Sequence, residues 1–336
     1  MKRVLFIGMN FYKYENQIIR RLQKQGYRVD YFIDKKDFFI DHIHFIHLSS
    51  KKKETMIERY QIKYLKKISE NRYDYVFVIV GRYLKKFFLE ELRAKNHDAV
   101  FILYLWDDIK RIENYEFSKN YFDRIYSFDP NDAKRENIHF LPLFYCGLVN
   151  ADPWAEQRKK KLDVFSVMYL HTDREKIAKK LVRKYPDARI KIIFKCSLLK
   201  AIKSRINRTE ESKKIVYRKK TVSEKKLISG MMSSCALLDI QFPSQVGLTM
   251  RTFDTMSAGR KLITTNASIQ YYDFFHENNI LIISREQPEI PSEFLVKVYQ
   301  PISDSILKKY SLEEWLNVMF EGNSVRYLIK NNPYGL

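Results

Sequence analysis

The chain has 336 residues, of which 45% are hydrophobic and 30% are charged. This length and composition suit two globular α/β domains and exclude a disordered chain. The longest uncharged apolar runs, 75–81 and 99–106, fall far short of the roughly 20 residues that a membrane-spanning helix needs. The formal net charge of +21 leaves three kinds of partner open: nucleic acid, an anionic membrane surface and a phosphate-rich substrate.

The first 150 residues alternate between strand signals and helix signals. The stretch 15–25 is amphipathic and is followed by Gly26, which predicts a helix that ends there. The predicted strands are 4–8, 27–33, 75–80, 100–105, 124–128 and 139–141. Continuous apolar runs of this kind are typical of buried parallel strands, so we expect a doubly wound sheet.

Much of the positive charge falls in three stretches, 51–67, 82–95 and 200–220. One interpretation is that each forms a helix with its apolar side in the core and its lysines in water. The other is that at least one stretch faces a membrane. No motif in the chain supports nucleic-acid recognition.

The second half of the chain shows a similar alternation. Residues 151–161 combine Asp152-Pro153 with a run of charges and predict a linker between two domains. The predicted strands beyond it are 164–170, 190–194, 236–240 and 262–265. Ser311 and Glu314 form a plausible capping box for a last helix that runs to about residue 329.

The stretch 236–265 predicts a strand, a glycine-containing loop, a helix that stops at Gly259 and a second strand. Open α/β sheets bind ligands in such loops, at the carboxyl ends of strands. Arg251 falls in the first turn of the helix, where the dipole favours anions, so a shared anionic ligand such as a diphosphate would explain it. Asp254 lies three residues on and would accept hydrogen bonds from a ribose. The alternative is a surface Arg–Asp pair on an ordinary helix.

The segment 247–266 resembles the donor-sugar half of GT-B glycosyltransferases, in particular small bacterial ones that assemble lipopolysaccharide, O-antigen or capsule. The resemblance extends to four more blocks: 4–11, Tyr104-Leu105-Trp106-Asp107-Asp108, 121–130 and 140–144. It implies an α/β protein of the GT-B fold, in which two Rossmann-like, doubly wound domains face each other across a cleft. Residues 1–150 would bind the acceptor, residues 162–310 would bind the nucleotide-sugar donor, and a C-terminal helix within 311–336 would cross back to the first domain.

The resemblance implies a donor site in the second domain. The backbone amides of 247–249 would hold phosphate, and Gln245 would contact phosphate or sugar hydroxyls. His171 and Arg174 end a strand and open a helix, which favours a second diphosphate contact, although His171 is equally explained as a helix-capping residue. The predicted donor-binding residues are His171, Arg174, Gln245, Gly247, Leu248, Thr249, Arg251 and Asp254.

Inverting transfer also needs a base that deprotonates the acceptor hydroxyl. By the same resemblance Asp107 or Glu15 is the base, and Asp107 is preferred because it directly follows a buried strand. Helix capping is the alternative role for each acid. The bulky aromatic residues Tyr12, Tyr14 and Trp106 are expected to bind the acceptor.

Many retaining GT-B enzymes carry Glu-x7-Glu across this donor region. Here Val246 occupies the first place and Asp254 the second, which favours inversion and leaves the stereochemistry open. His42, His44 and His47 have no Cys, Asp or Glu partner at ligand spacing, so we expect no metal site. We expect no other cofactor, because helix dipoles and basic side chains steady the leaving group in GT-B enzymes.

Together these observations predict a glycosyltransferase that moves a sugar from a nucleotide-diphosphate-sugar to a lipopolysaccharide core, O-antigen or capsule intermediate. Three scattered cysteines and the lack of a secretory signal predict a cytoplasmic protein. Its basic patches would bind the cytoplasmic face of the inner membrane, and no nucleic-acid partner is expected. The alternatives are a non-catalytic GT-B-like nucleotide-binding or scaffold protein and a basic nucleic-acid-binding α/β protein.

Overall fold

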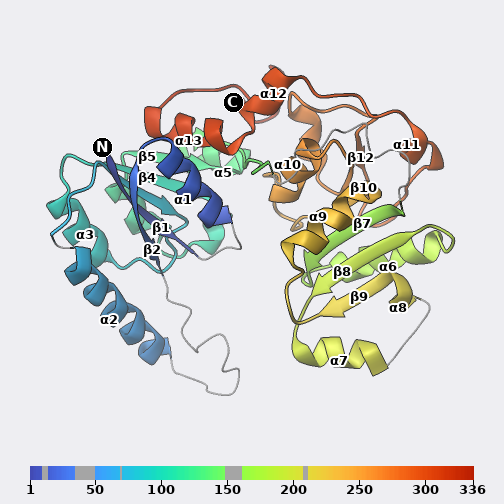
Figure 1. Ribbon diagram of the computed structural model, residues 1–336, viewed down its shortest axis with the longest axis horizontal. Coiled ribbons are helices and arrows are strands. Elements are labelled where there is room, and N and C mark those ends of the chain that lie inside the picture. Colours follow the sequence, from blue (N-terminus) through green and yellow to red (C-terminus); the bar gives the residue numbers. More distant parts are fainter. Residues whose placement is uncertain (10–13, 35–49, 69, 148–160, 207–210) are drawn as a thin grey trace. The chain divides into compact units, whose positions relative to one another are not determined.

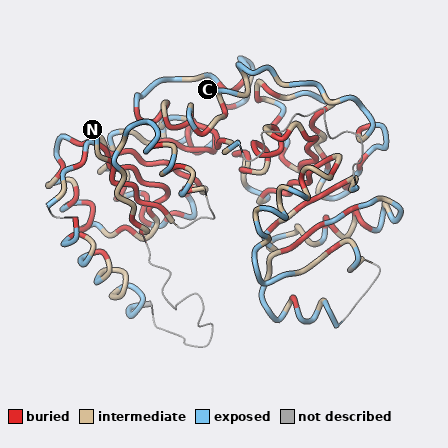
Figure 2. The backbone as a smooth tube through the Cα atoms, viewed as in Figure 1, coloured by how far each residue is buried: buried red, intermediate tan, exposed pale blue. Residues whose placement is uncertain are grey.

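The computed structural model describes residues 1–9, 14–34, 50–68, 70–147, 161–206 and 211–336. The chain forms two compact units, each with its own sheet (Figure 1). The first unit contains Met1–Pro142, Leu312–Arg326 and Pro333–Leu336, and the second contains Leu143–Ser311 and Tyr327–Asn332. Figure 2 shows that buried residues concentrate in the strands of both sheets.

The first unit contains a six-stranded sheet in which every strand pair is parallel. In spatial order its strands are β2 (Arg28–Ile33), β1 (Arg3–Gly8), β3 (Tyr75–Ile79), β4 (Val100–Leu105), β5 (Arg124–Ser127) and β6 (His139–Phe140). The chain runs from β1 to β2 on one side and then continues from β3 on the other. The switch point of this sheet therefore lies between β1 and β3, where doubly wound folds bind ligands.

Helices cover this sheet, whose central strands are buried along nearly their whole length. They are α1 (Tyr14–Lys24), α2 (Ser50–Ile68), α3 (Lys86–Lys95), α4 (Tyr115–Ser118), α5 (Pro130–Glu136) and α13 (Leu312–Glu321), with 3-10 turns η1 (Ile109–Arg111) and η2 (Lys119–Tyr121). The basic stretch 51–67 forms α2, whose Tyr60 and Tyr64 stack on Phe32 while its lysines are exposed.

The C-terminal helix α13 packs in the first unit, as the sequence predicted. Its Trp315 ring lies 4.6 Å from that of Tyr104 and 5.9 Å from that of Phe77, measured between centroids. Arg124 donates hydrogen bonds of 2.8 Å to the carbonyls of Met319 and Phe320, at the helix end where a cation is favoured. Figure 1 shows α13 beside α1, to which it is joined by an ion pair between Glu313 and Arg21, and Gln25, just beyond α1, donates a hydrogen bond to Asn317.

The predicted length of the last helix is wrong. It ends at Glu321 instead of running to about residue 329, because Gly322 adopts a left-handed φ of 79°. The chain then leaves the first unit, and Leu328 forms an antiparallel bridge with Tyr272 in the second unit.

The second unit contains another six-stranded, all-parallel sheet. In spatial order its strands are β12 (Ile280–Ile282), β11 (Lys261–Thr264), β10 (Ser234–Asp239), β7 (Leu162–Tyr169), β8 (Ile190–Lys195) and β9 (Ile215–Arg218). The two edge strands, β9 and β12, were not predicted from the sequence. The switch point lies between β7 and β10.

The helices of the second unit are α6 (Arg174–Lys184), α7 (Leu198–Ile206), α8 (Glu211–Lys214), α9 (Glu224–Met232), α10 (Met250–Ser257), α11 (Ser292–Val296) and α12 (Asp304–Lys309), with the 3-10 turn η4 (Ala267–Tyr271). One large apolar core joins β7, β8, β10 and α6, and a smaller one lies around Phe165 and Met231. Most of the predicted linker, residues 151–160, lies outside the described residues, as do Tyr12, His42, His44 and His47.

Candidate functional site

Three arginines gather at the carboxyl ends of β7 and β10, the switch point of the second sheet. Arg174 opens α6 just after β7, Arg251 lies in the first turn of α10, and Arg285 follows β12. Asp173 and Asp239 are the carboxylates paired with this cluster. The cluster places three cations at the end of the sheet where open α/β folds bind ligands, with the Glu286 carboxylate also within electrostatic reach of Arg285.

Arg174 joins two segments of the second unit. Its Nε donates to the Ile240 carbonyl at 2.5 Å and its Nη1 to the Tyr169 carbonyl at 3.1 Å, so it ties β7 to the loop after β10. Burial, aided by the nearby charges of Arg251 and Arg285, outweighs the opposing effect of Asp239 and lowers the pKa of the Arg174 guanidinium to about 10. The group still carries its charge at pH 7, and an anionic ligand would offset the cost of burying it.

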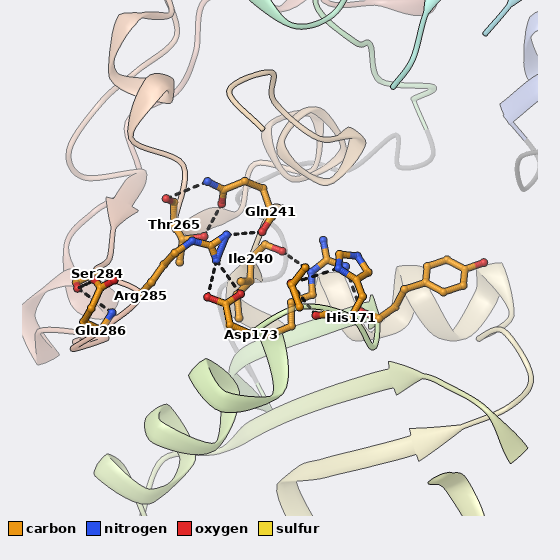
Figure 3. A network of polar contacts seen from close by, with 11 residues as sticks. His171, Asp173, Ile240, Gln241, Thr265, Ser284, Arg285 and Glu286 are labelled. Carbon is orange, nitrogen blue, oxygen red and sulfur yellow. Dashed lines mark hydrogen bonds and ion pairs between the residues drawn. The ribbon is translucent and has the colours of Figure 1, made fainter. Parts of the chain in front are cut away.

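Arg285 joins three segments of the cluster (Figure 3). Its Nη1 lies 3.1 Å from one carboxylate oxygen of Asp173 and 3.3 Å from the other, and its Nη2 donates to the Gln241 carbonyl at 2.5 Å. Gln241 is itself held by Thr265, with its Nε2 donating to the Thr265 carbonyl at 3.1 Å. Only 17% of the Arg285 side chain is exposed, which makes it a fixed part of the site.

Arg251 points inward from α10. Its Nη2 donates to the Val167 carbonyl of β7, and its Nε lies 3.5 Å from Oδ1 of Asp239. Thr249 donates from Oγ1 to Oδ2 of the same carboxylate at 2.9 Å. The Asp239 carboxylate, 5% exposed, therefore aligns both the first helical turn and its arginine.

The alternative of a surface Arg251–Asp254 pair does not fit this arrangement, because Arg251 pairs with Asp239 and Asp254 is 7% exposed. Asp254 is one of six buried residues on α10. Its predicted contact with a ribose stays a prediction.

The loop between β10 and α10 is tethered from its far side. Asn266 and Ser268, which follow β11, both donate to the Val246 carbonyl, at 3.0 and 2.6 Å. Gln245 donates from Nε2 to the Gly247 carbonyl at 2.7 Å, so its side chain is used within the loop. Leu248 is 2% exposed and its side chain belongs to the core, so only its backbone groups could contact a ligand.

His171 lies on the turn between β7 and α6, on the same side of the sheet as the arginines. Its ring lies 5.5 Å from that of Phe242, in the loop after β10, so the two loops meet through this contact. The next residue, Thr172, has a φ of 51°. A left-handed β-branched residue costs roughly 1–3 kcal/mol and is typical of functional turns.

A second cluster of charges lies at the carboxyl ends of β3 and β4 in the first unit. Arg82 lies 2.6 Å and Arg111 3.5 Å from the carboxylate of Asp107, which is 32% exposed. The turn that carries Arg82 contains Val80 and Gly81, both left-handed with φ of 63° and 61°. Asp107 is therefore an accessible carboxylate oriented by two cations beside a strained turn.

Glu15, the other candidate base, has both carboxylate oxygens engaged inside the first unit. Oε1 accepts from the Met9 amide at 2.7 Å and Oε2 from the Tyr31 hydroxyl at 2.5 Å. Gly8 makes room for this contact, since a Cβ there would lie 2.4 Å from Oε1. With 4% exposure Glu15 anchors the loop after β1.

Of the predicted acceptor-binding aromatics, Tyr14 and Trp106 lie together, with ring centroids 6.0 Å apart. Trp106 is 9% exposed and also packs against Trp315 of α13, so it is largely a core residue. Tyr12 lies outside the described residues.

The sequence did not single out Arg285, Asp239 or Arg82. Arg82 closely follows β3, so the rule that found Arg174 and Asp107 would have found it, whereas Asp239 is the last residue of β10 and lies inside the predicted strand 236–240. Arg285 follows β12, which has three residues and gives too short an apolar run to predict a strand.

Within the described ranges, no group of three His, Cys, Asp or Glu side chains could hold a metal ion. No helix in the same part of the chain is both long and apolar enough to cross a membrane.

Several solved structures resemble this chain over nearly its whole length. An alpha-glucosyltransferase in complex with UDP and a 13-mer DNA containing a central A:G mismatch has a TM-score of 0.60 and 12% identity, and the match covers 94% of this chain and 95% of that one. A glycosyltransferase from Rickettsia africae has a TM-score of 0.59 and 9% identity, with 95% and 97% covered. An alpha,alpha-trehalose-phosphate synthase (UDP-forming) from Burkholderia xenovorans also has a TM-score of 0.59 and 9% identity, with 95% and 99% covered.

No protein-family model matches the sequence, and no curated protein matches it either. At identities of 9 to 12% the structural likeness defines the fold. Both six-stranded parallel sheets, with their alternating helices, are covered by these matches. The chain therefore has the GT-B fold of glycosyltransferases, as its sequence predicted.

Proposed function

We propose that this protein is a glycosyltransferase whose donor is a nucleotide-diphosphate-sugar. The observation that carries the proposal is the cluster of Arg174, Arg251 and Arg285 at the switch point of the second sheet. Guanidinium groups form strong paired hydrogen bonds to phosphate. The GT-B fold and the three guanidinium groups of the cluster both fit a diphosphate.

The arginines would have two tasks. They bind the diphosphate of the donor, together with the amides at the start of α10, and they stabilise the negative charge that develops on the leaving nucleotide. Positive charge supplied by three side chains makes transfer independent of a bound metal. Since one similar structure is a complex with UDP and another is a UDP-forming synthase, we propose a UDP-sugar as the first donor to test.

We propose Asp107 as the base and inversion as the stereochemical outcome. Asp107 is more accessible than Glu15, and Arg82 and Arg111 fix the direction of its carboxylate. Tyr14 and Trp106, together with Tyr12, would contact the acceptor.

The proposed acceptor is a lipopolysaccharide core, O-antigen or capsule intermediate at the cytoplasmic face of the inner membrane. The support for it is the resemblance of the sequence blocks to small bacterial enzymes of this kind and the net charge of +21. DNA is the competing acceptor, because one structurally similar glucosyltransferase was solved with DNA. A nucleotide-binding protein without transfer activity is the remaining alternative.

The decisive experiment measures binding of UDP, GDP, ADP, CMP and dTDP by thermal shift and calorimetry, in wild type and Arg285→Gln. The loss of a charged hydrogen-bonding group costs about 1.5–3 kcal/mol, so we expect a loss of affinity of about 10- to 150-fold. Arg189→Gln is the matched control, because it breaks another Arg–Asp pair, with Asp163, at the amino ends of β7 and β8.

Equal affinities in the two variants would contradict the donor site. If nucleotide binds at the arginine cluster and neither sugar transfer nor donor hydrolysis follows with any acceptor, the non-catalytic alternative is correct. Sugar transfer to duplex DNA and not to lipid-linked glycans would replace the proposed acceptor.

A further inference from the structure

Helix α7 exposes its apolar side chains to solvent. Leu198, Leu199, Ile202 and Ile206 are 50%, 72%, 44% and 74% exposed. The residue that the helix buries is Ala201, at 4% exposure. This is the reverse of an ordinary surface helix, and Figure 2 shows α7 as a largely exposed segment of the second unit.

The four apolar residues form one stripe. On a helix with 3.6 residues per turn, Leu198, Ile202, Ile206 and Leu199 lie within about 100° of one another. The opposite side of the helix faces the protein. There Lys200 lies 3.0 Å from the carboxylate of Glu175, and its ammonium lies 5.3 Å from the centre of the Tyr217 ring.

Exposed basic residues flank the stripe on both sides. Lys203 lies about 40° beyond Leu199 and Arg205 about 20° beyond Leu198. The surrounding stretch 195–226 carries twelve Lys and Arg and three Glu. This stretch thus holds an excess of nine positive charges, out of +21 for the whole chain.

We propose that α7 is a docking helix for a membrane surface rich in anionic phospholipid. Its aliphatic stripe enters the boundary between headgroups and acyl chains, while Lys203 and Arg205 bind lipid phosphates. The inference deepens the proposed function, and for its purpose it rests on the membrane-bound acceptor proposed there. It replaces a general attachment through basic patches with one helix of the second unit.

The chemistry of the stripe favours lipid over nucleic acid. Proteins bind single strands through aromatic side chains that stack on bases, whereas the exposed apolar residues of α7 are leucine and isoleucine. The purely aliphatic side chains of Leu199 and Ile206 would gain free energy on entering the acyl chains of a membrane.

The test uses the full-length protein and sucrose-loaded vesicles of phosphatidylcholine with 0 to 40% phosphatidylglycerol. We expect co-sedimentation to rise with the anionic fraction. Leu199→Gln combined with Ile206→Gln should lower the partition coefficient at least about tenfold, because both positions lose burial in lipid. Lys203→Gln combined with Arg205→Gln should reduce the dependence on phosphatidylglycerol.

Val296→Gln combined with Val298→Gln is the matched control. These two valines are 80% and 62% exposed, and they lie at and just beyond α11, another helix of the same unit (Figure 1). Vesicle binding should be unchanged in this variant. An equal loss in both pairs, or no binding by wild type at 40% phosphatidylglycerol, overturns the assignment to α7.

Two further outcomes also overturn the inference: salt-sensitive binding to DNA without vesicle binding, and a monomer–dimer equilibrium in ultracentrifugation that the α7 pair abolishes without any effect on lipid. Nucleotide affinity, measured without lipid, separates this inference from the proposed function. Failure of lipid binding with nucleotide binding intact refutes only the docking helix. Failure of nucleotide binding with lipid binding intact refutes only the donor site.

Discussion

Two β-branched residues adopt a left-handed backbone beside the charged clusters of the two sheets. Val80 follows β3 and precedes Arg82, and Thr172 follows β7 and precedes Arg174. Such a conformation costs roughly 1–3 kcal/mol at each position and persists only where the surroundings enforce it. In both units the strained residue lies two positions before an arginine of a charged cluster. The strained turn therefore helps to set the direction of that arginine side chain.

The proposal that Asp107 is the catalytic base can be tested by substituting this single residue. We expect Asp107→Asn to lower kcat by about 10²- to 10⁴-fold, because the amide cannot accept the acceptor's proton, while donor affinity stays the same. The measurement is initial rate against both substrates. Asp108→Asn, which alters the adjacent carboxylate that caps η1, should transfer sugar at nearly the wild-type rate. Full activity in Asp107→Asn would move the assignment to another acid.

The carboxylate of Glu175 should make the free energy of unfolding depend on pH. Burial tends to raise its pKa, but hydrogen bonds from Tyr217, Lys179 and Lys200 outweigh burial and hold the pKa at about 2, below the ordinary 4.5. Since the folded pKa is the lower one, Glu175 contributes stability that is present above about pH 4.5 and is lost as the pH falls towards 2.

Urea unfolding of wild type and Glu175→Gln at a series of pH values checks this dependence. We expect wild type to be more stable than the variant at pH 6 and the difference to shrink steadily below pH 4.5. A difference that is constant across this range would show that the carboxylate charge is not the stabilising feature.

At the scale of elements, glycines end two helices of the first unit in the same conformation but different surroundings. Gly322 follows α13 with φ 79°, and Gly26 lies just beyond α1 with φ 88°. A Cβ on Gly26 would meet nothing within 4 Å, whereas one on Gly322 would lie 3.2 Å from Cζ of Arg124. Arg124 is the cation that binds the last carbonyls of α13.

Alanine at either glycine should cost roughly 1–2 kcal/mol of left-handed strain. Gly322→Ala should cost a further ~0.3–1 kcal/mol, because it displaces the arginine from the helix end. Chemical denaturation of the two variants measures the difference. Equal destabilisation would mean that Arg124 moves aside without loss.

Most helices and strands were predictable because each depends on a local pattern of apolar residues and glycines in the sequence. Continuous apolar runs predicted the central strands of both sheets, and Gly259 predicted the end of α10. The edge strand β9 lies among lysines and β12 has three residues, so neither gives a clear apolar run. The site residues were predictable where they adjoin a local pattern, as Arg174 and Arg251 do beside predicted strands and helices. Arg285, in contrast, pairs with Asp173, which lies 112 positions away in the sequence. No local pattern reports a contact of that kind.

At the scale of the whole molecule, each unit has its own sheet and core, and ligand binding should stabilise them unequally. The arginine cluster lies within the second unit, so a nucleotide at 100 times its Kd should stabilise that unit by about 2.7 kcal/mol. Hydrogen exchange should slow in β10 and β11 and stay unchanged in β3 and β4. Protection of both units to the same degree would contradict a donor site confined to the second.

The return of α13 to the first unit has a consequence for synthesis on the ribosome. The sheet of the first unit is complete in sequence by residue 140, yet Trp315, which packs on Phe77 and Tyr104, emerges only after Leu143–Ser311 has been made. For the time needed to translate those intervening residues, the aromatic face that α13 covers stays open in the nascent chain. The first unit, whose synthesis begins first, can therefore complete its folding only after the second unit has been synthesised. A chain terminated before residue 312 would leave the ribosome with that aromatic face exposed to chaperones and proteases.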